Sequence, residues 1–243
     1  MNRRNLLTNI LGGAVLTTAV FGTDIFAQTP AENARERRRQ RNRTIKKYPN
    51  EHFYNADGTF NVQKAKDAYV ELFRFHNYSL PGVVKDERFW AVDFGLGDFA
   101  SVGMGGIFWL NDKEHGYFGH EIYLLPFQMI PEHAHVEAEE KPAKHEYWQV
   151  RHGSIYNFGK GGSKDDLDKL PVKLPKSQLD ANAITAFKCV ELKAGTGKGS
   201  EAALSGIGDY HFMLAGENGA IVTEYASFHS NDGLKFQNKK AKL

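Results

Sequence analysis

The chain has 243 residues, of which 41% are hydrophobic, 12% aromatic and 25% charged, and its formal net charge is +2. A chain of this size and apolar content can bury the core of a whole domain, so wholesale disorder is excluded. Its single cysteine, Cys189, excludes a disulfide scaffold and a cysteine-built zinc site. The 24 glycines against 8 prolines favour the many tight turns of a β-rich fold.

Residues 1–27 have the pattern of an export signal peptide. Arg3 and Arg4 form a basic start, and the small or apolar stretch at 10–22 is too short for a spanning helix, which needs about 20 residues. The paired arginines resemble a twin-arginine signal, which exports folded proteins; an ordinary secretory signal is the alternative. We therefore expect a mature protein in a bacterial periplasm, without a membrane anchor.

Residues 28–60 are predicted to form a basic polar arm ahead of a folded domain at 61–243. Between residues 31 and 47 the arm carries eight basic residues against two glutamates. Such a run can bind nucleic acid. However, no aromatic residues interleave with the arginines, and an exported protein rarely meets nucleic acid. We therefore expect a solvated linker and no nucleic-acid partner.

An amphipathic helix is predicted over residues 62–76. Its apolar residues recur three and four positions apart between Ala65 and Phe73, and so form one face. Asn61 can cap its first turn. The segment 78–82, which contains Pro and Gly, then breaks the chain.

Beyond this helix, short apolar runs alternate with turns rich in Gly, Asn and Asp. The pattern predicts an antiparallel sandwich or barrel. The Glu-Asn-Gly sequence at 217–219 predicts a hairpin between the last two strands, and 160–182 reads as a surface loop. The predicted strands cover residues 104–111, 120–130, 145–151, 154–159, 184–192, 210–215 and 219–228.

A histidine pair gives the first indication of a chemical site. His133 and His135 are two positions apart, and in a β-strand such residues point to the same face. Imidazole together with carboxylate suits Mn, Fe, Co, Ni or Zn. A third ligand is expected from a neighbouring strand across a hairpin, and the candidates there are Glu137, Glu139, Glu140 and Glu146.

The spacing around this pair resembles the two motifs of the cupin superfamily. In the first, a glutamate is followed by six residues and a glycine, as Glu146 is followed by Gly153. The second ends in a Gly-x-x-His turn, which 206–211 match with Gly206 in place of the usual proline. The resemblance implies a mainly β fold, the cupin double-stranded β-helix or jelly-roll barrel, with an N-terminal helical extension. The metal ligands that it implies are His133, His135, Glu146 and His211.

From about Tyr69 to Phe236 the chain is more specifically similar to one cupin branch, the D-lyxose isomerase-like sugar isomerases. The Asp-Phe-Gly-Leu-Gly-Asp-Phe segment at 93–99 and the Lys-x-Glu segment at 144–146 match that family. So does the Glu-Tyr-Ala-Ser segment at 224–227. The resemblance implies aldose–ketose isomerisation of a pentose or hexose, such as lyxose–xylulose or mannose–fructose.

Such a reaction requires a metal and a base. A divalent ion, manganese first, with zinc, iron or cobalt as alternatives, would polarise the carbonyl and stabilise the enediolate. We assign Glu224 as the base that moves the proton between carbons, and Lys144 as the group that holds a substrate oxygen. The competing interpretations are a surface carboxylate and a solvated hairpin lysine.

One position departs from the family pattern. The family carries a lysine on the strand before the histidine pair, near His120 or Glu121, and this sequence has none there. His120 is the candidate to replace it in catalysis. The alternatives to an isomerase are another metal-dependent cupin enzyme, such as a dioxygenase or decarboxylase, and a non-catalytic carbohydrate- or metal-binding protein. By analogy with cupins we expect a homodimer with a small sugar substrate.

Overall fold

The computed structural model describes residues 44–79, 82–85, 87–138 and 142–243. The predicted export signal and most of the basic arm lie outside these ranges, as do Glu139 and Glu140. The described residues belong to one compact unit, Thr44–Leu243, which begins before the boundary predicted at residue 61. Within the described ranges, no helix is both long and apolar enough to cross a membrane.

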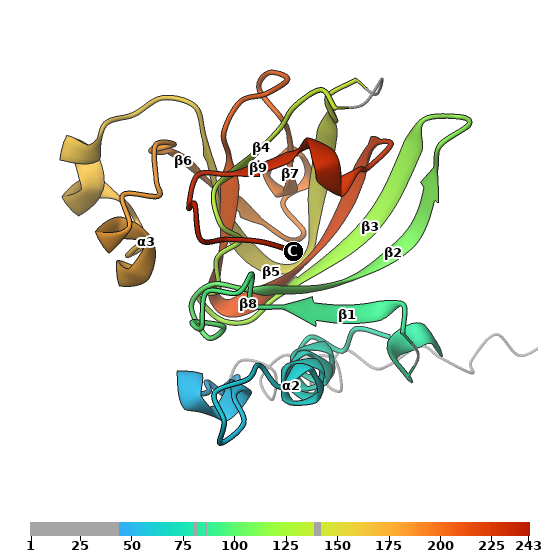
Figure 1. Ribbon diagram of the computed structural model, residues 1–243, viewed down its shortest axis with the longest axis vertical. Helices are drawn as coiled ribbons and strands as arrows, with labels where there is room; N and C mark the ends of the chain where they lie inside the picture. The colour runs from blue at the N-terminus through green and yellow to red at the C-terminus, as the bar shows by residue number, and fades with distance from the viewer. Residues whose placement is uncertain (1–43, 80–81, 86, 139–141) are drawn as a thin grey trace, which may run out of the picture. The chain divides into compact units, whose positions relative to one another are not determined.

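Helix α2 (Val62–Phe75) forms where the apolar periodicity predicts it. Asn61 caps the helix, because its side-chain oxygen accepts a hydrogen bond from the backbone N–H of Lys64 at 3.0 Å. Its buried face, which includes Tyr69 and Phe73, packs in an aromatic cluster with side chains of the β-sheet. Figure 1 shows α2 beside strand β1 (Phe89–Val92), outside the barrel.

The end of the predicted basic arm belongs to the same core. Ile45 and Phe53 are buried in the aromatic cluster, and the short 3-10 helix η1 (Asn50–Phe53) precedes α2. Apolar and aromatic residues in this stretch therefore add it to the folded domain, despite the basic composition around 31–47.

The described strands form a mainly antiparallel fold, as the sequence predicts. One seven-stranded sheet has the order β1-β2-β3-β8-β5-β6, with β7 also paired to β5, and β4 pairs with β9 in a second sheet. The remaining strands are β2 (Met104–Asp112), β3 (Tyr117–Leu124), β4 (His133–His135), β5 (Glu146–Gly159), β6 (Lys188–Lys193), β7 (Glu201–Ala203), β8 (Phe212–Ser227) and β9 (Leu234–Phe236).

The predicted hairpin at 217–219 is wrong, because β8 runs through these residues as a single strand. It pairs with β5 on both sides of them, Ile155 with Ala215 and Gly153 with Ala220, so the extra residues form a bulge. Gly153 has a φ of +72°, and a Cβ there would lie 2.0 Å from a carbonyl oxygen of the bulge. The Asn-Gly sequence thus lies where the backbones of two paired strands approach closely, and the chain does not reverse there.

Other predicted boundaries also shift. The strand predicted at 120–130 ends at Leu124, since Pro126 follows and has no N–H for a sheet ladder. The strands predicted at 145–151 and 154–159 are the single strand β5, joined through a bulge. The loop predicted at 160–182 contains the short 3-10 helix η3 (Lys164–Lys169) and helix α3 (Lys176–Asp180). The other short 3-10 helices are η2 (Gly82–Lys85), η4 (Gly197–Ser200) and η5 (Asn231–Gly233).

The register of three adjacent strands decides which side chains face the barrel interior. Strands β3, β8 and β5 lie side by side, and His120, Glu224 and Trp148 are directly opposite one another across them. Two residues further along β3, Ile122 stands in the same way opposite Val222. Because side chains alternate along a strand, these rows share the interior face with the polar residues of the site.

Candidate metal centre

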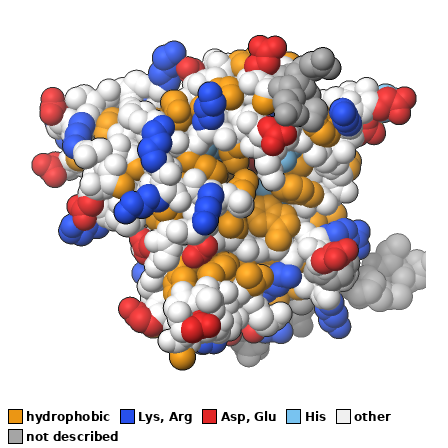
Figure 2. All heavy atoms as spheres, viewed as in Figure 1, with side chains coloured by type: hydrophobic (Ala, Val, Ile, Leu, Met, Phe, Trp, Pro, Cys, Tyr) orange, Lys and Arg blue, Asp and Glu red, His pale blue; other side chains and the backbone are white. Residues whose placement is uncertain are grey.

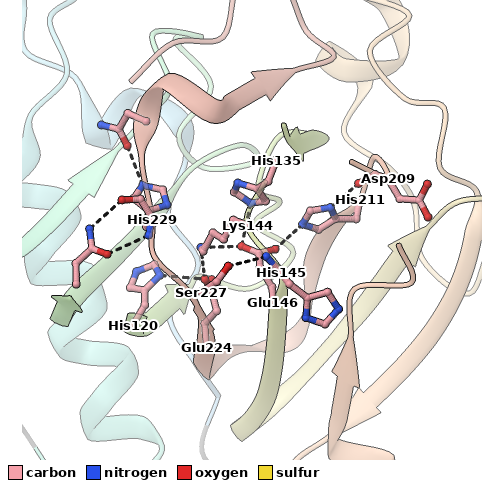
Figure 3. Close-up of polar contacts among 12 residues, drawn as sticks. His120, His135, Lys144, His145, Glu146, Asp209, His211, Glu224, Ser227 and His229 are labelled. Carbon is pink, nitrogen blue, oxygen red and sulfur yellow. Dashed lines mark hydrogen bonds and ion pairs between the residues drawn. The ribbon is translucent and has the colours of Figure 1, made fainter. Parts of the chain in front are cut away.

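A cavity of about 300 Å³ lies inside the barrel. Figure 2 shows a hollow on the viewed face, with apolar side chains around it and histidine side chains within it. Most of the cavity lining is apolar. Its polar groups gather in a cluster of histidines, glutamates and one lysine, which come from β3, β4, β5, β8 and the segments next to them (Figure 3).

Four of these residues bring their donor atoms together. One ligand atom from each of His133, His135, Glu146 and His211 lies within 4.8 Å of the others. The two histidines of β4 face the same cavity, as their spacing predicts. His211 comes just before β8 and exchanges backbone hydrogen bonds of 3.0 and 2.9 Å with His133.

Hydrogen bonds to the backbone fix the tautomers of two of the histidines. Nδ1 of His133 lies 2.9 Å from the carbonyl oxygen of Pro131, and Nδ1 of His211 lies 3.0 Å from that of Asp209. A carbonyl oxygen can only accept, so each Nδ1 carries the hydrogen and each Nε2 keeps its lone pair for a metal. Burial, together with the other histidines, holds the pKa of His133 well below its ordinary value, which keeps the ring neutral.

The residues present fit a bound cation. Nε2 of His135 and Nε2 of His211 each lie 2.9 Å from an oxygen of the Glu146 carboxylate. The contact of His135 lacks the geometry of a hydrogen bond, so its buried Nε2 has no hydrogen-bond partner among the described residues. Burial alone would lower the pKa of His211, but the Glu146 carboxylate raises it. A positive charge between these side chains is therefore favourable. Three imidazoles and one carboxylate suit a divalent ion of the first transition row.

Lys144 connects the ligand cluster to a second carboxylate. Its ammonium lies 2.8 Å from Oε1 of Glu146 and also pairs with Oε1 of Glu224. Burial alone would raise the pKa of both carboxyls, but this ammonium and the neighbouring histidines together outweigh it and hold both pKa values below their ordinary range. Burial also opposes the charge of Lys144, and the two carboxylates raise its pKa nonetheless. All three groups are therefore charged at neutral pH.

The same geometry excludes the competing interpretations of two residues. Lys144 and Glu224 are each only 6% exposed, so neither is a solvated lysine or a surface carboxylate. They lie on the cavity wall beside Glu146, and Figure 3 shows the three side chains pointing toward one another.

Both the sequence and the fold of the chain are similar to those of known proteins. No protein-family model matches the chain. It is 32% identical to the D-lyxose/D-mannose isomerase of Thermosediminibacter oceani over 171 residues, 70% of this chain and 87% of that protein. It is also 28% identical to the D-lyxose ketol-isomerase of Cohnella laeviribosi, over 68% of this chain and 84% of that protein.

The chain belongs to the D-lyxose isomerase-like family of sugar isomerases.

Solved structures of sugar isomerases share the fold of this family member. The L-ribose isomerase of Cellulomonas parahominis matches with a TM-score of 0.53 at 16% identity, over 78% of this chain and 95% of that one. The L-ribose isomerase of Acinetobacter sp. DL28 matches with a TM-score of 0.54 at 13% identity, over 78% of this chain and 95% of that one. The predicted cupin-type barrel with an N-terminal helix is thereby confirmed.

This member of the D-lyxose isomerase-like family places a histidine where we expect the family's lysine. His120 faces the cavity, with Nδ1 3.6 Å from Oε2 of Glu224. Glu121 points to the opposite face of the sheet, where it accepts hydrogen bonds from Tyr78 at 2.5 Å and Thr223 at 2.9 Å. Of the two positions left open by the sequence, His120 is therefore the one that can act in the cavity.

His120 is held in a nonpolar environment. Trp90 stacks on its ring at 5.5 Å, and the rings of Phe108 and Phe118 pack around it. A Cβ at Gly106 would lie 2.4 Å from Nε2 of His120, so the glycine leaves room for the imidazole. Burial lowers the pKa of His120 despite the nearby carboxylate of Glu224, which makes it a neutral neighbour of that group.

The predicted hairpin between the histidine strand and the glutamate strand is wrong. Strand β4 pairs with β9, His133 opposite Phe236 and His135 opposite Leu234. Glu146 instead opens β5, in the other sheet, and its side chain meets the histidines across the cavity. Glu137, another candidate for the third ligand, is exposed.

One residue of the cavity wall has no sequence signal. His229 lines the cavity beyond the end of β8, and its ring centroid lies 6.4 Å from that of His135. In the sequence, no other potential metal ligand lies at a motif spacing from His229, so nothing distinguishes it from any lone histidine. Only the fold brings it to the site.

Proposed function

We propose that this protein is a metal-dependent aldose–ketose isomerase for a pentose or hexose, of the lyxose–xylulose or mannose–fructose type. The observation that carries the proposal is the buried ammonium of Lys144, which bridges Glu146 of the ligand cluster and Glu224. A metal-binding group and an ionised base therefore share one cavity wall. The D-lyxose isomerases to which the chain is similar support the choice of substrate.

The four clustered residues would hold the metal. A divalent ion bound there, manganese first, with zinc, iron or cobalt as alternatives, supplies Lewis-acid polarisation of the substrate's carbonyl and neighbouring hydroxyl oxygens. The imidazoles of His133 and His211 would present Nε2 to it, because their Nδ1 atoms donate to backbone carbonyls.

Glu224 would act as the base. Its lowered pKa keeps it ionised at neutral pH, so it can take a proton from the carbon next to the carbonyl. It then returns this proton to the former carbonyl carbon, while the hydroxyl proton moves to the former carbonyl oxygen, so that the carbonyl and the hydroxyl exchange places. Lys144 would hold a substrate oxygen and orient Glu224, while His120 would support the other carboxylate oxygen.

The test combines metal analysis with an isomerisation assay in deuterium oxide. The purified protein is loaded with manganese and incubated with lyxose, xylulose, mannose and fructose. We expect conversion of at least one aldose–ketose pair, with deuterium from the solvent appearing at the carbon next to the carbonyl. Oxygen consumption is followed in parallel, because it would indicate a dioxygenase. Failure of the metal-loaded protein to convert any of these sugars contradicts the proposal.

The ligand set is tested separately by metal content. His133→Ala and Glu146→Ala should each lose bound metal, while His115→Ala, a histidine whose side chain is 62% exposed, should keep it. If Glu146→Ala retains the metal and His133→Ala loses it, Glu146 is not a ligand.

A further inference from the structure

The cavity offers few polar side chains away from the metal cluster and the base. Apart from those residues, from Lys144 and His120 beside the base, and from two tryptophan N–H groups, the polar side chains among the described lining residues are His229 and Asn231. A sugar carries hydroxyl groups beyond the oxygens at its reacting carbons. In an apolar cavity the burial of each hydroxyl costs free energy unless it forms a hydrogen bond. His229 and Asn231 are therefore the candidates to bind a hydroxyl that is far from the base.

His229 is held in a defined position. Its backbone N–H donates to Oδ1 of Asn111 at 3.0 Å, and its carbonyl oxygen accepts from Nδ2 of the same residue at 2.9 Å. Its ring stacks on Phe118 with a centroid distance of 5.2 Å and an interplanar angle of 24°. A side chain fixed through both backbone and ring loses little entropy when it binds a ligand.

Asn231 determines which nitrogen of His229 is available. Nε2 lies 2.8 Å from Oδ1 of Asn231, and an amide oxygen can only accept, so Nε2 carries the hydrogen. Burial, together with the charge of Lys144, lowers the pKa of His229 to about 4 and keeps the ring neutral. Nδ1 therefore bears a lone pair, and this atom is buried without a hydrogen-bond partner among the described residues.

We propose that His229 recognises the substrate by accepting, through Nδ1, a hydrogen bond from one hydroxyl that is not at the reacting carbons. This inference rests on the proposed isomerase function. His229 lines the cavity and its ring is 6.4 Å from that of His135, so one small sugar can contact both the ligand cluster and the ring that carries Nδ1. A substrate that lacks this hydroxyl would leave the nitrogen unpaired, which is a strong basis for discrimination.

The test uses metal-loaded His229→Phe, which keeps a ring to stack on Phe118 but has no nitrogen. Initial rates are measured with the best natural sugar and with its singly deoxygenated analogues. We expect KM for the natural sugar to rise about tenfold, as for the loss of one hydrogen bond, with kcat within about twofold. For one deoxy analogue, the one that lacks the recognised hydroxyl, wild type and variant should have the same KM.

An unchanged KM with the natural sugar overturns the inference. So does an equal loss with every deoxy analogue, because that result indicates a structural role. Metal content and thermal unfolding are measured on each variant, and His115→Phe serves as the control for replacing a histidine outside the cavity. If His229→Phe does not fold, Asn231→Ala replaces it. That variant frees the ring to change tautomer, so KM should rise, and Asn231→Asp should restore it because a carboxylate again accepts from Nε2.

The same variants separate this inference from the proposed function. If the metal-loaded wild type converts no sugar, the isomerase proposal fails, and binding of the non-reacting polyol xylitol is measured by calorimetry instead. A Kd about tenfold higher for His229→Phe then still supports recognition by His229, and an equal Kd overturns it.

Discussion

The two faces of strand β3 bound two buried regions of opposite character. On one face, the side chains of His120 and Ile122 line the cavity. On the other face, Tyr123 belongs to the aromatic cluster between α2 and the sheet. In the aromatic cluster, the Tyr69 hydroxyl donates to Gln128 at 2.7 Å, and the Gln128 amide donates to a backbone carbonyl at 2.6 Å. The Tyr123 hydroxyl of this cluster is buried without a hydrogen-bond partner among the described residues. The cavity wall has more such atoms, namely side-chain nitrogens of Trp90, His120, His135, Trp148 and His229.

This difference separates the sources of stability and of function. Side chains that bury apolar area and satisfy their polar atoms stabilise the fold. Side chains that bury polar atoms without hydrogen-bond partners, or like charges close together, lower the stability of the fold but are available to bind a ligand. Mutations in the cavity should therefore change activity more than stability. Mutations in the aromatic cluster packed against α2 should change stability more than activity.

The largest effect is expected from Glu224→Gln. The amide keeps the shape of the carboxylate but cannot take the proton, so kcat should fall by about 10²- to 10⁴-fold. The ligand cluster does not include this residue, so metal content should stay at the wild-type level. Turnover and metal analysis on one preparation check both expectations, and a variant with wild-type kcat would remove Glu224 from the role of base.

Phe73→Ala tests the other region. Phe73 is fully buried and packs against Tyr123 with a ring distance of 4.5 Å. Its truncation should lower the free energy of unfolding by about 3–5 kcal/mol, measured by urea denaturation. The kcat of the folded fraction should be unchanged. A large fall in kcat at full occupancy of the folded state would show that the two regions are coupled.

Acid should affect the cavity more than the aromatic cluster. Burial would raise the pKa of Glu224, but Lys144 and His120 together outweigh it and lower the pKa below its ordinary 4.5. The unfolded chain therefore takes up this proton at a higher pH than the folded chain. The stabilisation is present above about pH 4.5 and is lost as the pH falls through the folded-state pKa.

We expect the urea midpoint of the wild type to decrease on acidification over this interval, and to decrease less steeply in Glu224→Gln. Phe73→Ala is the matched comparison, because it should keep the wild-type slope at a lower stability. Parallel slopes in the wild type and Glu224→Gln would show that Glu224 contributes nothing to the pH dependence.

The smallest effect is expected from Asn61→Ala at the start of α2. The side chain accepts one hydrogen bond from the backbone of Lys64, so its loss should lower the free energy of unfolding by about 1 kcal/mol. The helix lies outside the barrel, and kcat and KM should not change. Asn61→Ser, which can still cap the helix, should recover most of the loss.

Local patterns predicted much of the fold and most of the site. The single apolar face of 62–76 identified α2 to within one residue, because helical periodicity is a local property. The spacing of His133 and His135 placed both rings in one cavity for the same reason. Glu146 and His211 followed from motif resemblance, and the structure brings them to the pair.

The errors have a common physical origin. The Asn-Gly sequence near 218 favours a tight turn, but its conformation depends on Gly153, a residue distant in sequence that allows the backbones of the paired strands β5 and β8 to approach closely. The partner of β4 also depended on a strand far along the chain. His229 was missed because its contacts with Asn111 and Phe118 join segments that are distant in sequence. Local periodicity carries no information about such pairings.

The pairing of β4 with β9 has a consequence for how the protein is made. The strand that bears His133 and His135 is held by Leu234–Phe236, which follow every other described strand. A ribosome releases the histidine pair long before it releases the strand that fixes it. The ligand cluster is therefore completed only after Leu234–Phe236 have been synthesised, and a metal bound there, as we propose, would be held firmly only once they have closed the second sheet.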